Sequence, residues 1–103
     1  MAAAEPTLTA SVAATIKQHR ERQGLTLEAL AEAAGVHRTS LGLVERGRRG
    51  MTIDVAARLC WALDLSLADV IAAGEAQARL LPGALGQARV RPGPAGRGPA
   101  LDA

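Results

Sequence analysis

The stretch Leu27–Arg46, LEALAEAAGVHRTSLGLVER, decides the fold of this chain. Its small, apolar and glycine positions fall where two helices that cross at a tight turn need them. Gly35 can adopt a positive φ at that turn, and Ala31, one helical turn earlier, is small enough to let the following helix approach closely. The spacing is that of a helix-turn-helix unit, and its shared apolar interface is expected from the inward positions Leu30, Ala34, Val36, Leu41 and Val44.

Apolar residues at helical spacing, bounded by caps and breakers, predict five short helices in all. A Thr or Ser N-cap precedes the second, fourth and fifth helices, and a glycine follows the first, second, third and fifth. The fifth is expected to end where Gly74 follows it. The predicted helices cover residues 10–23, 27–34, 38–46, 53–63 and 67–73.

The composition favours the same fold class. At 103 residues the chain has the length of one domain, and 23 of its residues are Ala. Tyr and Phe are absent and there is one Trp, so the residues that build strands are scarce while helix formers dominate. We expect an all-α protein, a compact bundle of five helices.

Several function classes are excluded by what the sequence lacks. One cysteine and two histidines that lie 18 residues apart offer neither a disulfide nor a metal cluster. No nucleophile–base pair, paired acids or phosphate loop is evident, so we expect no enzyme and no cofactor. The N-terminus has no basic region before an apolar stretch, and no apolar run approaches 18 residues, which predicts a cytoplasmic protein without a membrane partner.

Charge and composition divide the chain into three parts. Residues 1–9 are expected to be a flexible N-terminus, residues 10–74 the helical domain, and residues 75–103 a mostly disordered tail, because nine of the nineteen residues from Pro82 to Ala100 are Gly or Pro. Residues 36–50 carry a net charge of +3, and the tail adds four arginines. Such basic patches suit phosphate binding, although a charged solvated surface is the alternative for either patch.

The third predicted helix has two faces. Leu41 and Val44 face inward, whereas Thr39, Gly42, Leu43 and Arg46 form an opposite stripe without an acid, with Arg38 at the helix start. An acid-free face of this kind suits entry into a groove of DNA, and contacts with the DNA bases are then expected from Arg38, Thr39 and Leu43. Phosphate contacts are expected from Arg46, Arg48 and Arg49, near and beyond the end of the helix. The alternatives are an exposed helix side and a solvated loop.

Residues 12–73 resemble the Cro/phage-repressor-type helix-turn-helix family, also called the xenobiotic-response-element (XRE) family. The likeness depends on matches at consistent spacing, namely Gly24-Leu25-Thr26, Leu30-Ala31, Gly35-Val36, Leu41, Val44-Glu45-Arg46-Gly47 and Leu63-Asp64-Leu65-Ser66-Leu67. It implies a lambda-repressor-like, five-helix DNA-binding domain whose third helix enters the major groove, usually from a homodimer on a palindromic operator. It also implies a structural ion pair between Arg20 and Glu45, for which the alternative is two unrelated surface charges.

Three residues depart from the family pattern. Leu27 stands where the family commonly has a phosphate-binding Gln, so backbone N–H groups must replace that interaction or it is missing. His37 stands at the N-cap of the third helix, where Ser or Thr is usual. Gly42 lies inside that helix at a cost of about 1 kcal/mol relative to Ala. The departures predict a loosely held recognition helix in the absence of DNA.

Trp61 is left unburied by helical geometry, because the inward stripe of its helix is Ala56, Leu59, Cys60 and Leu63. An exposed Trp indicates a partner interface, either with a second subunit or with Leu80 and Leu81 folding back from the tail. Cys60 is expected to be a small core residue, and His19 a core or boundary residue.

The sequence therefore predicts a sequence-specific binder of double-stranded DNA, a transcriptional regulator that acts as a homodimer. Two alternatives remain. One is a protein-interaction module, antitoxin-like or an adaptor, that uses the same fold to bind a protein partner. The other is a nonspecific nucleic-acid binder whose affinity comes mostly from the arginines of the tail.

Overall fold

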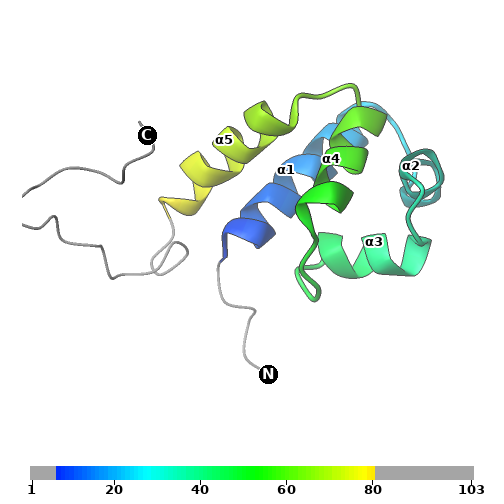
Figure 1. The fold of residues 1–103 in the computed structure, drawn as a ribbon, viewed down its shortest axis with the longest axis horizontal. Coiled ribbons are helices and arrows are strands. Elements are labelled where there is room, and N and C mark those ends of the chain that lie inside the picture. The colour runs from blue at the N-terminus through cyan, green and yellow to red at the C-terminus, as the bar shows by residue number, and fades with distance from the viewer. Residues whose placement is uncertain (1–6, 81–103) are drawn as a thin grey trace, which may run out of the picture.

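The computed structural model describes residues 7–80, and these form five helices without a strand. The expected all-α fold is confirmed. Figure 1 shows α1 and α5 side by side, with α2 and α3 together at the end of the domain remote from α5. The helices are α1 (Leu8–Arg22), α2 (Leu27–Ala34), α3 (Arg38–Glu45), α4 (Ile53–Ala62) and α5 (Leu67–Ala78).

Hydroxyl caps fix the start of four helices. In each, the N-cap side-chain oxygen accepts a hydrogen bond from the backbone N–H three residues later, at 2.9 to 3.3 Å. The exception is α3, where His37 makes no side-chain cap bond. The capped helices begin after Thr7, Thr26, Thr52 and Ser66.

A left-handed residue ends each of the first four helices. Gly35 after α2 has φ 71°, and the N–H of Val36 then donates to the carbonyl of Ala31 at 2.9 Å, which is the Schellman arrangement. The same backbone pattern follows α1, α3 and α4, where the left-handed residues are Gly24, Gly47 and Asp64. Because the chain reverses tightly after each helix, short connections suffice to bring the elements together.

All five helices contribute side chains to the core. Its largest buried side chains are Ile16, Leu30, Leu41, Leu59 and Leu63, each at most 2% exposed. Gln23, at the end of α1, donates from Nε2 to the carbonyl of Leu63 at 2.8 Å and so ties α1 to the end of α4.

The structure corrects the predicted end of the fifth helix. Gly74 does not terminate α5 but lies buried inside it, and the helix continues to Ala78. A Cβ at Gly74 would lie 2.6 Å from Val12 Cγ2 and 3.0 Å from Val12 Cα, so the glycine allows the backbones of α1 and α5 to approach closely. The additional turn buries Ala78 completely. Smaller differences are that α1 begins two residues earlier than predicted, whereas α1, α3 and α4 each end one residue earlier.

Candidate nucleic-acid interface

The inner face of the helix-turn-helix unit is buried. Leu30, Ala31, Ala34, Leu41 and Val44 are all at most 5% exposed. Val36, in the turn, is half-buried and packs against the same cluster. The apolar interface predicted from the spacing is therefore present, and it fixes α3 against α2.

An ion pair ties α3 to α1. Arg20 Nε donates to Glu45 Oε2 at 2.8 Å and Arg20 Nη2 donates to Glu45 Oε1 at 3.0 Å. A third donor, Nη1, reaches the carbonyl of Leu25 at 2.7 Å. The two side chains are 12% and 6% exposed, and the hydrogen bond to Glu45 raises the pKa of Arg20. The pair expected from the family resemblance is thus a nearly buried bidentate contact that holds the recognition helix.

Not all residues predicted to face outward on α3 are exposed. Arg38 and Thr39 are exposed at the first two positions of the helix, and Leu43 is half-buried. Gly42, predicted to face outward, is buried. The reason is that Leu27 of α2 and the side chain of Arg46 cover it, since a Cβ there would lie 3.5 Å from Leu27 Cδ2 and 3.6 Å from Arg46 Nη1.

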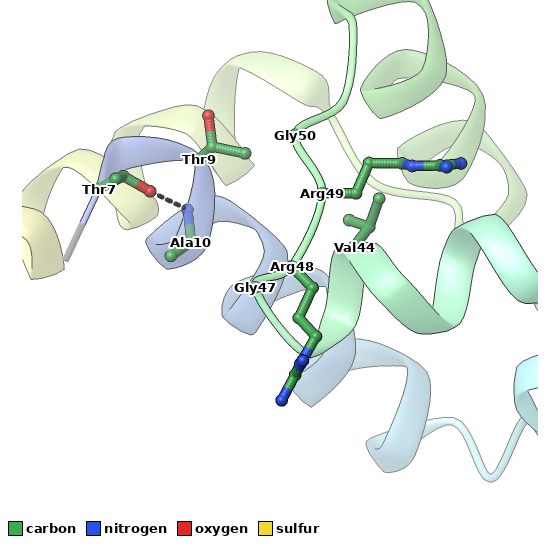
Figure 2. A pocket seen from close by; sticks show the side chains of 8 residues that line it. All are labelled: Thr7, Thr9, Ala10, Val44, Gly47, Arg48, Arg49 and Gly50. Atoms are coloured by element: carbon green, nitrogen blue, oxygen red, sulfur yellow. Dashed lines mark hydrogen bonds between the residues drawn. The ribbon is translucent and has the colours of Figure 1, made fainter. Parts of the chain in front are cut away.

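The three arginines that follow α3 are exposed but do not point the same way. Arg46, the C-cap residue, folds its guanidinium back along α3 toward Gly42 and Leu27. Figure 2 shows Arg48 and Arg49 leaving the loop after α3 in different directions. Arg49 Nη1 donates to Ser40 Oγ of α3 at 2.9 Å, so its guanidinium lies beside the recognition helix. The same loop borders a hollow whose other wall is the start of α1, at Thr7, Thr9 and Ala10.

An acidic residue that the sequence did not assign to the interface lies against Arg38. Arg38 Nη1 donates to Glu28 Oε2 at 3.0 Å, and the two side chains are 63% and 59% exposed. A hydrogen bond from its own backbone N–H, and then the one from Arg38, lower the pKa of Glu28. From the sequence, an acid in the first turn of a helix indicates a favourable interaction with the helix dipole and nothing more. The helical period of either segment gives no signal for the pair, because the contact depends on how α2 and α3 approach each other.

The other residues discussed in the sequence analysis lie outside the helix-turn-helix unit. Trp61 is 70% exposed, as its helical position predicts. Leu80 is 81% exposed and so does not cover it, while Leu81 lies outside the described residues. Cys60 is fully buried in the core, and burial raises the pKa of its thiol. His19 is half-buried.

Metal clusters and membrane spans are absent from the described residues. Between residues 7 and 80, no group of three or more His, Cys, Asp or Glu side chains is arranged to hold a metal ion. None of the helices in this range is long and apolar enough to cross a membrane.

Comparison with known proteins gives matches to most of the helical domain. Residues 11–73 match the family model described as a helix-turn-helix domain. The chain is 38% identical over 56 residues to control protein C.SmaI of Serratia marcescens, which is 54% of this chain and 67% of that protein. The crystal structure of the clp gene regulator ClgR from Corynebacterium glutamicum matches with a TM-score of 0.69 and 36% identity, over 74% of this chain and 81% of that one. The master regulator for biofilm formation SinR, solved in complex with DNA, matches with a TM-score of 0.55 and 31% identity, over 58% of this chain and 97% of that one.

Proposed function

The chain belongs to the helix-turn-helix domain family, and on that premise we propose that it is a transcriptional regulator that binds a specific DNA sequence with α3 in the major groove. C.SmaI, ClgR and SinR are described as a control protein and two regulators, and SinR is described in complex with DNA. The similarity to all three supports the proposal.

The observation that carries the proposal is the exposure of Arg38 and Thr39 on a helix whose other face is fixed. A recognition helix reads bases with its N-terminal residues, and these two are the first of α3. Arg38 would donate to O6 and N7 of a guanine, and Thr39 would bond a neighbouring base edge. Leu43, half-buried one turn later, would contact a thymine methyl group with the part of its side chain that is exposed.

Selection of bound sequences from random double-stranded DNA tests the proposal directly. We expect one preferred sequence for the wild type, and a relaxed preference at one position for Arg38→Ala with a loss of about 1 to 3 kcal/mol. Thr39→Ala and Leu43→Ala should each relax a different position. Arg58→Ala removes an exposed arginine from α4 and serves as the control, for which the preferred sequence should be unchanged. Equal weakening on all sequences by Arg38→Ala would assign that residue to phosphate instead.

The backbone contacts of the proposed complex come from Arg46, Arg48 and Arg49. Arg46 would reach a phosphate near the start of α2, because its guanidinium lies over Gly42 and beside Leu27. This contact would replace the one that the family makes with a Gln at position 27. Arg49, whose guanidinium lies beside Ser40 of α3, would contact a phosphate of the same DNA strand. Arg48 leaves the loop in a different direction and would contact a different phosphate.

We further propose that the DNA-binding unit is a homodimer and that Trp61 contacts the second copy. Two recognition helices related by a two-fold axis read two half-sites, which is the usual arrangement for this motif. Trp61 is a large apolar side chain left 70% exposed by the fold, and Trp is enriched at the centres of interfaces.

The intrinsic fluorescence of Trp61 tests the dimer, because it is the only Trp in the chain. We expect its emission to shift to shorter wavelength as the protein concentration rises, in parallel with dimer formation followed by sedimentation. Trp61→Ser should shift the equilibrium toward monomer, while Arg79→Ala, which removes an exposed arginine at the far end of α5, should not. A monomer that binds no DNA at low salt would favour the protein-interaction module instead.

A further inference from the structure

The contact between Glu28 and Arg38 is too exposed to contribute much to the stability of the fold. It joins two side chains that are 59% and 63% exposed through one hydrogen bond of 3.0 Å. Exposed pairs of this kind contribute little to folding stability. In addition, a carboxylate at the start of the recognition helix repels the phosphates of DNA that approaches this face. An effect of the pair is therefore expected in DNA recognition instead of in folding.

The geometry of the contact constrains Arg38 without using up its donors. A guanidinium carries five N–H groups in a planar fork, and Glu28 accepts from Nη1 only. The remaining N–H groups stay free to donate to the two acceptors of a guanine edge. A free arginine side chain has a large rotamer entropy, part of which is lost when it binds a base. Holding the side chain in advance lowers that loss.

Glu28 is itself well placed to act as the fixed partner. It belongs to α2, which is packed against the core through Leu30 and Ala31 and held to α3 by the buried inner face of the unit. The carboxylate is ionised at neutral pH like that of any exposed glutamate, and the two hydrogen bonds lower its pKa further. The contact thus joins a restrained carboxylate to a long side chain whose direction decides which base it meets.

We propose that Glu28 is a positioning residue that orients Arg38 toward a guanine and so sharpens the choice of base at one operator position without contacting DNA. The inference rests on the proposed function, since it requires Arg38 to read a base. It assigns a role in specificity to a residue of α2, outside the recognition helix.

A double-mutant cycle on the full chain tests this role. Binding of Glu28→Ala, Arg38→Ala and the double variant is measured on four operators that differ only at the position assigned to Arg38. We expect Glu28→Ala to reduce the preference for guanine about fivefold, and to leave the preference unchanged when Arg38 is already Ala. Glu28→Gln, which keeps an acceptor oxygen, should retain part of the preference. Melting temperatures should agree among the variants, since the pair is exposed.

Glu32→Ala is the matched control, because Glu32 is another exposed acid of α2, one turn further from its start. Glu32→Ala should strengthen binding to all four operators alike by reducing repulsion, and should leave the preference unchanged. Glu28→Ala should strengthen binding to the three operators without the guanine, and it alone should reduce the preference for guanine. An unchanged preference for Glu28→Ala, together with a changed one for Arg38→Ala, would overturn the positioning role alone. If Arg38→Ala also left the preference unchanged, the proposed reading of Arg38 would fall as well.

Discussion

Arginine has three different roles at the scale of single residues in this domain. Arg20 is nearly buried and bonded through three donors, Arg38 is exposed and held by one contact, and Arg79 pairs with Glu75 on the surface of α5. Burial separates these roles, because a charge removed from water must keep its partner, whereas an exposed one is solvated. The consequence of substitution should differ accordingly.

Breaking the Arg20–Glu45 pair should destabilise the domain strongly. We expect Arg20→Met to lower the free energy of unfolding by about 3 to 5 kcal/mol, because it leaves the Glu45 carboxylate nearly buried without its partner. Urea denaturation measures the effect. Arg79→Met, which breaks an exposed pair, is the control and should change stability by less than about 1 kcal/mol. The double variant Arg20→Met with Glu45→Leu should recover much of the loss, and a fully additive loss would contradict this account.

The titration of Glu28 should report its two hydrogen bonds separately. Its pKa is lowered first by its own backbone N–H and then by Arg38. We expect Arg38→Ala to raise the pKa of Glu28 only part of the way to its ordinary value, as followed by carboxyl NMR. Because the folded-state pKa is lowered, the contribution of Glu28 to stability is present above its ordinary pKa and is lost as the pH falls through the folded value. An unchanged pKa in the variant would mean that the contact with Arg38 does not form in solution.

Glycine has two opposite functions at the scale of helices. Gly35 permits the left-handed backbone of the turn, whereas Gly42 and Gly74 lie inside helices with ordinary backbone angles. The surroundings of the two interior glycines differ. Gly74 faces the backbone of α1 at Val12, while Gly42 faces the ends of two side chains, Leu27 and Arg46.

Alanine substitutions at the two interior glycines should therefore have opposite signs. Gly42→Ala should stabilise the domain by up to about 1 kcal/mol, because the new methyl would meet its neighbours at ordinary contact distance and Ala favours the helix. Gly74→Ala should destabilise by about 1 to 3 kcal/mol, because the methyl would press on the Val12 backbone and separate α1 from α5. Thermal and urea unfolding of both variants would decide the matter, and the same sign for both would contradict the packing described for α5.

In the whole molecule, the packing of α5 on α1 lies at one side of the domain, and the exposed arginines that follow α3 lie away from α5. α5 lies at one side and α2 with α3 at the other, while α1 contacts both α5 and α3 (Figure 1). Residues 7–80 contain the entire core cluster and the arginines after α3 that are proposed to contact phosphate. The tail assigned to residues 75–103 is helical as far as Ala78, and residues 81–103 lie outside the described part.

Salt dependence should show which part of the chain meets the DNA backbone. Removing one phosphate contact should flatten the slope of log affinity against log salt by about 0.9. Arg48→Ala with Arg49→Ala should thus reduce the slope by about 1.8 and weaken all sequences alike, without altering base preference. The comparison is a chain shortened by residues 82–103, whose slope should change less. If the shortened chain failed to bind DNA while the two arginine substitutions had no effect, the nonspecific binder would be the correct interpretation.

The family and the element order could be predicted from the sequence, and so could most of the buried and exposed positions of the helix-turn-helix unit. The caps, the glycine after each of the first three helices and the buried stripes were all visible, and the all-α fold and family membership are confirmed. The exposure of Arg38 and Thr39 followed from the same helical periodicity. The base and phosphate roles of these residues stay predictions.

The sequence by itself determined where most helices begin and end and which stripe of each is buried, because caps, breakers and periodicity act over a few neighbouring residues. Only the tertiary structure decided what lies against a position from another helix. The sequence predicts that Gly74 ends the fifth helix, whereas in the structure it lies inside α5 against α1. The sequence predicts that Gly42 faces outward, whereas Leu27 covers it. The contact of Glu28 with Arg38 joins residues ten positions apart. Such pairings depend on how two helices approach, and the period of a single helix carries no information about its neighbour.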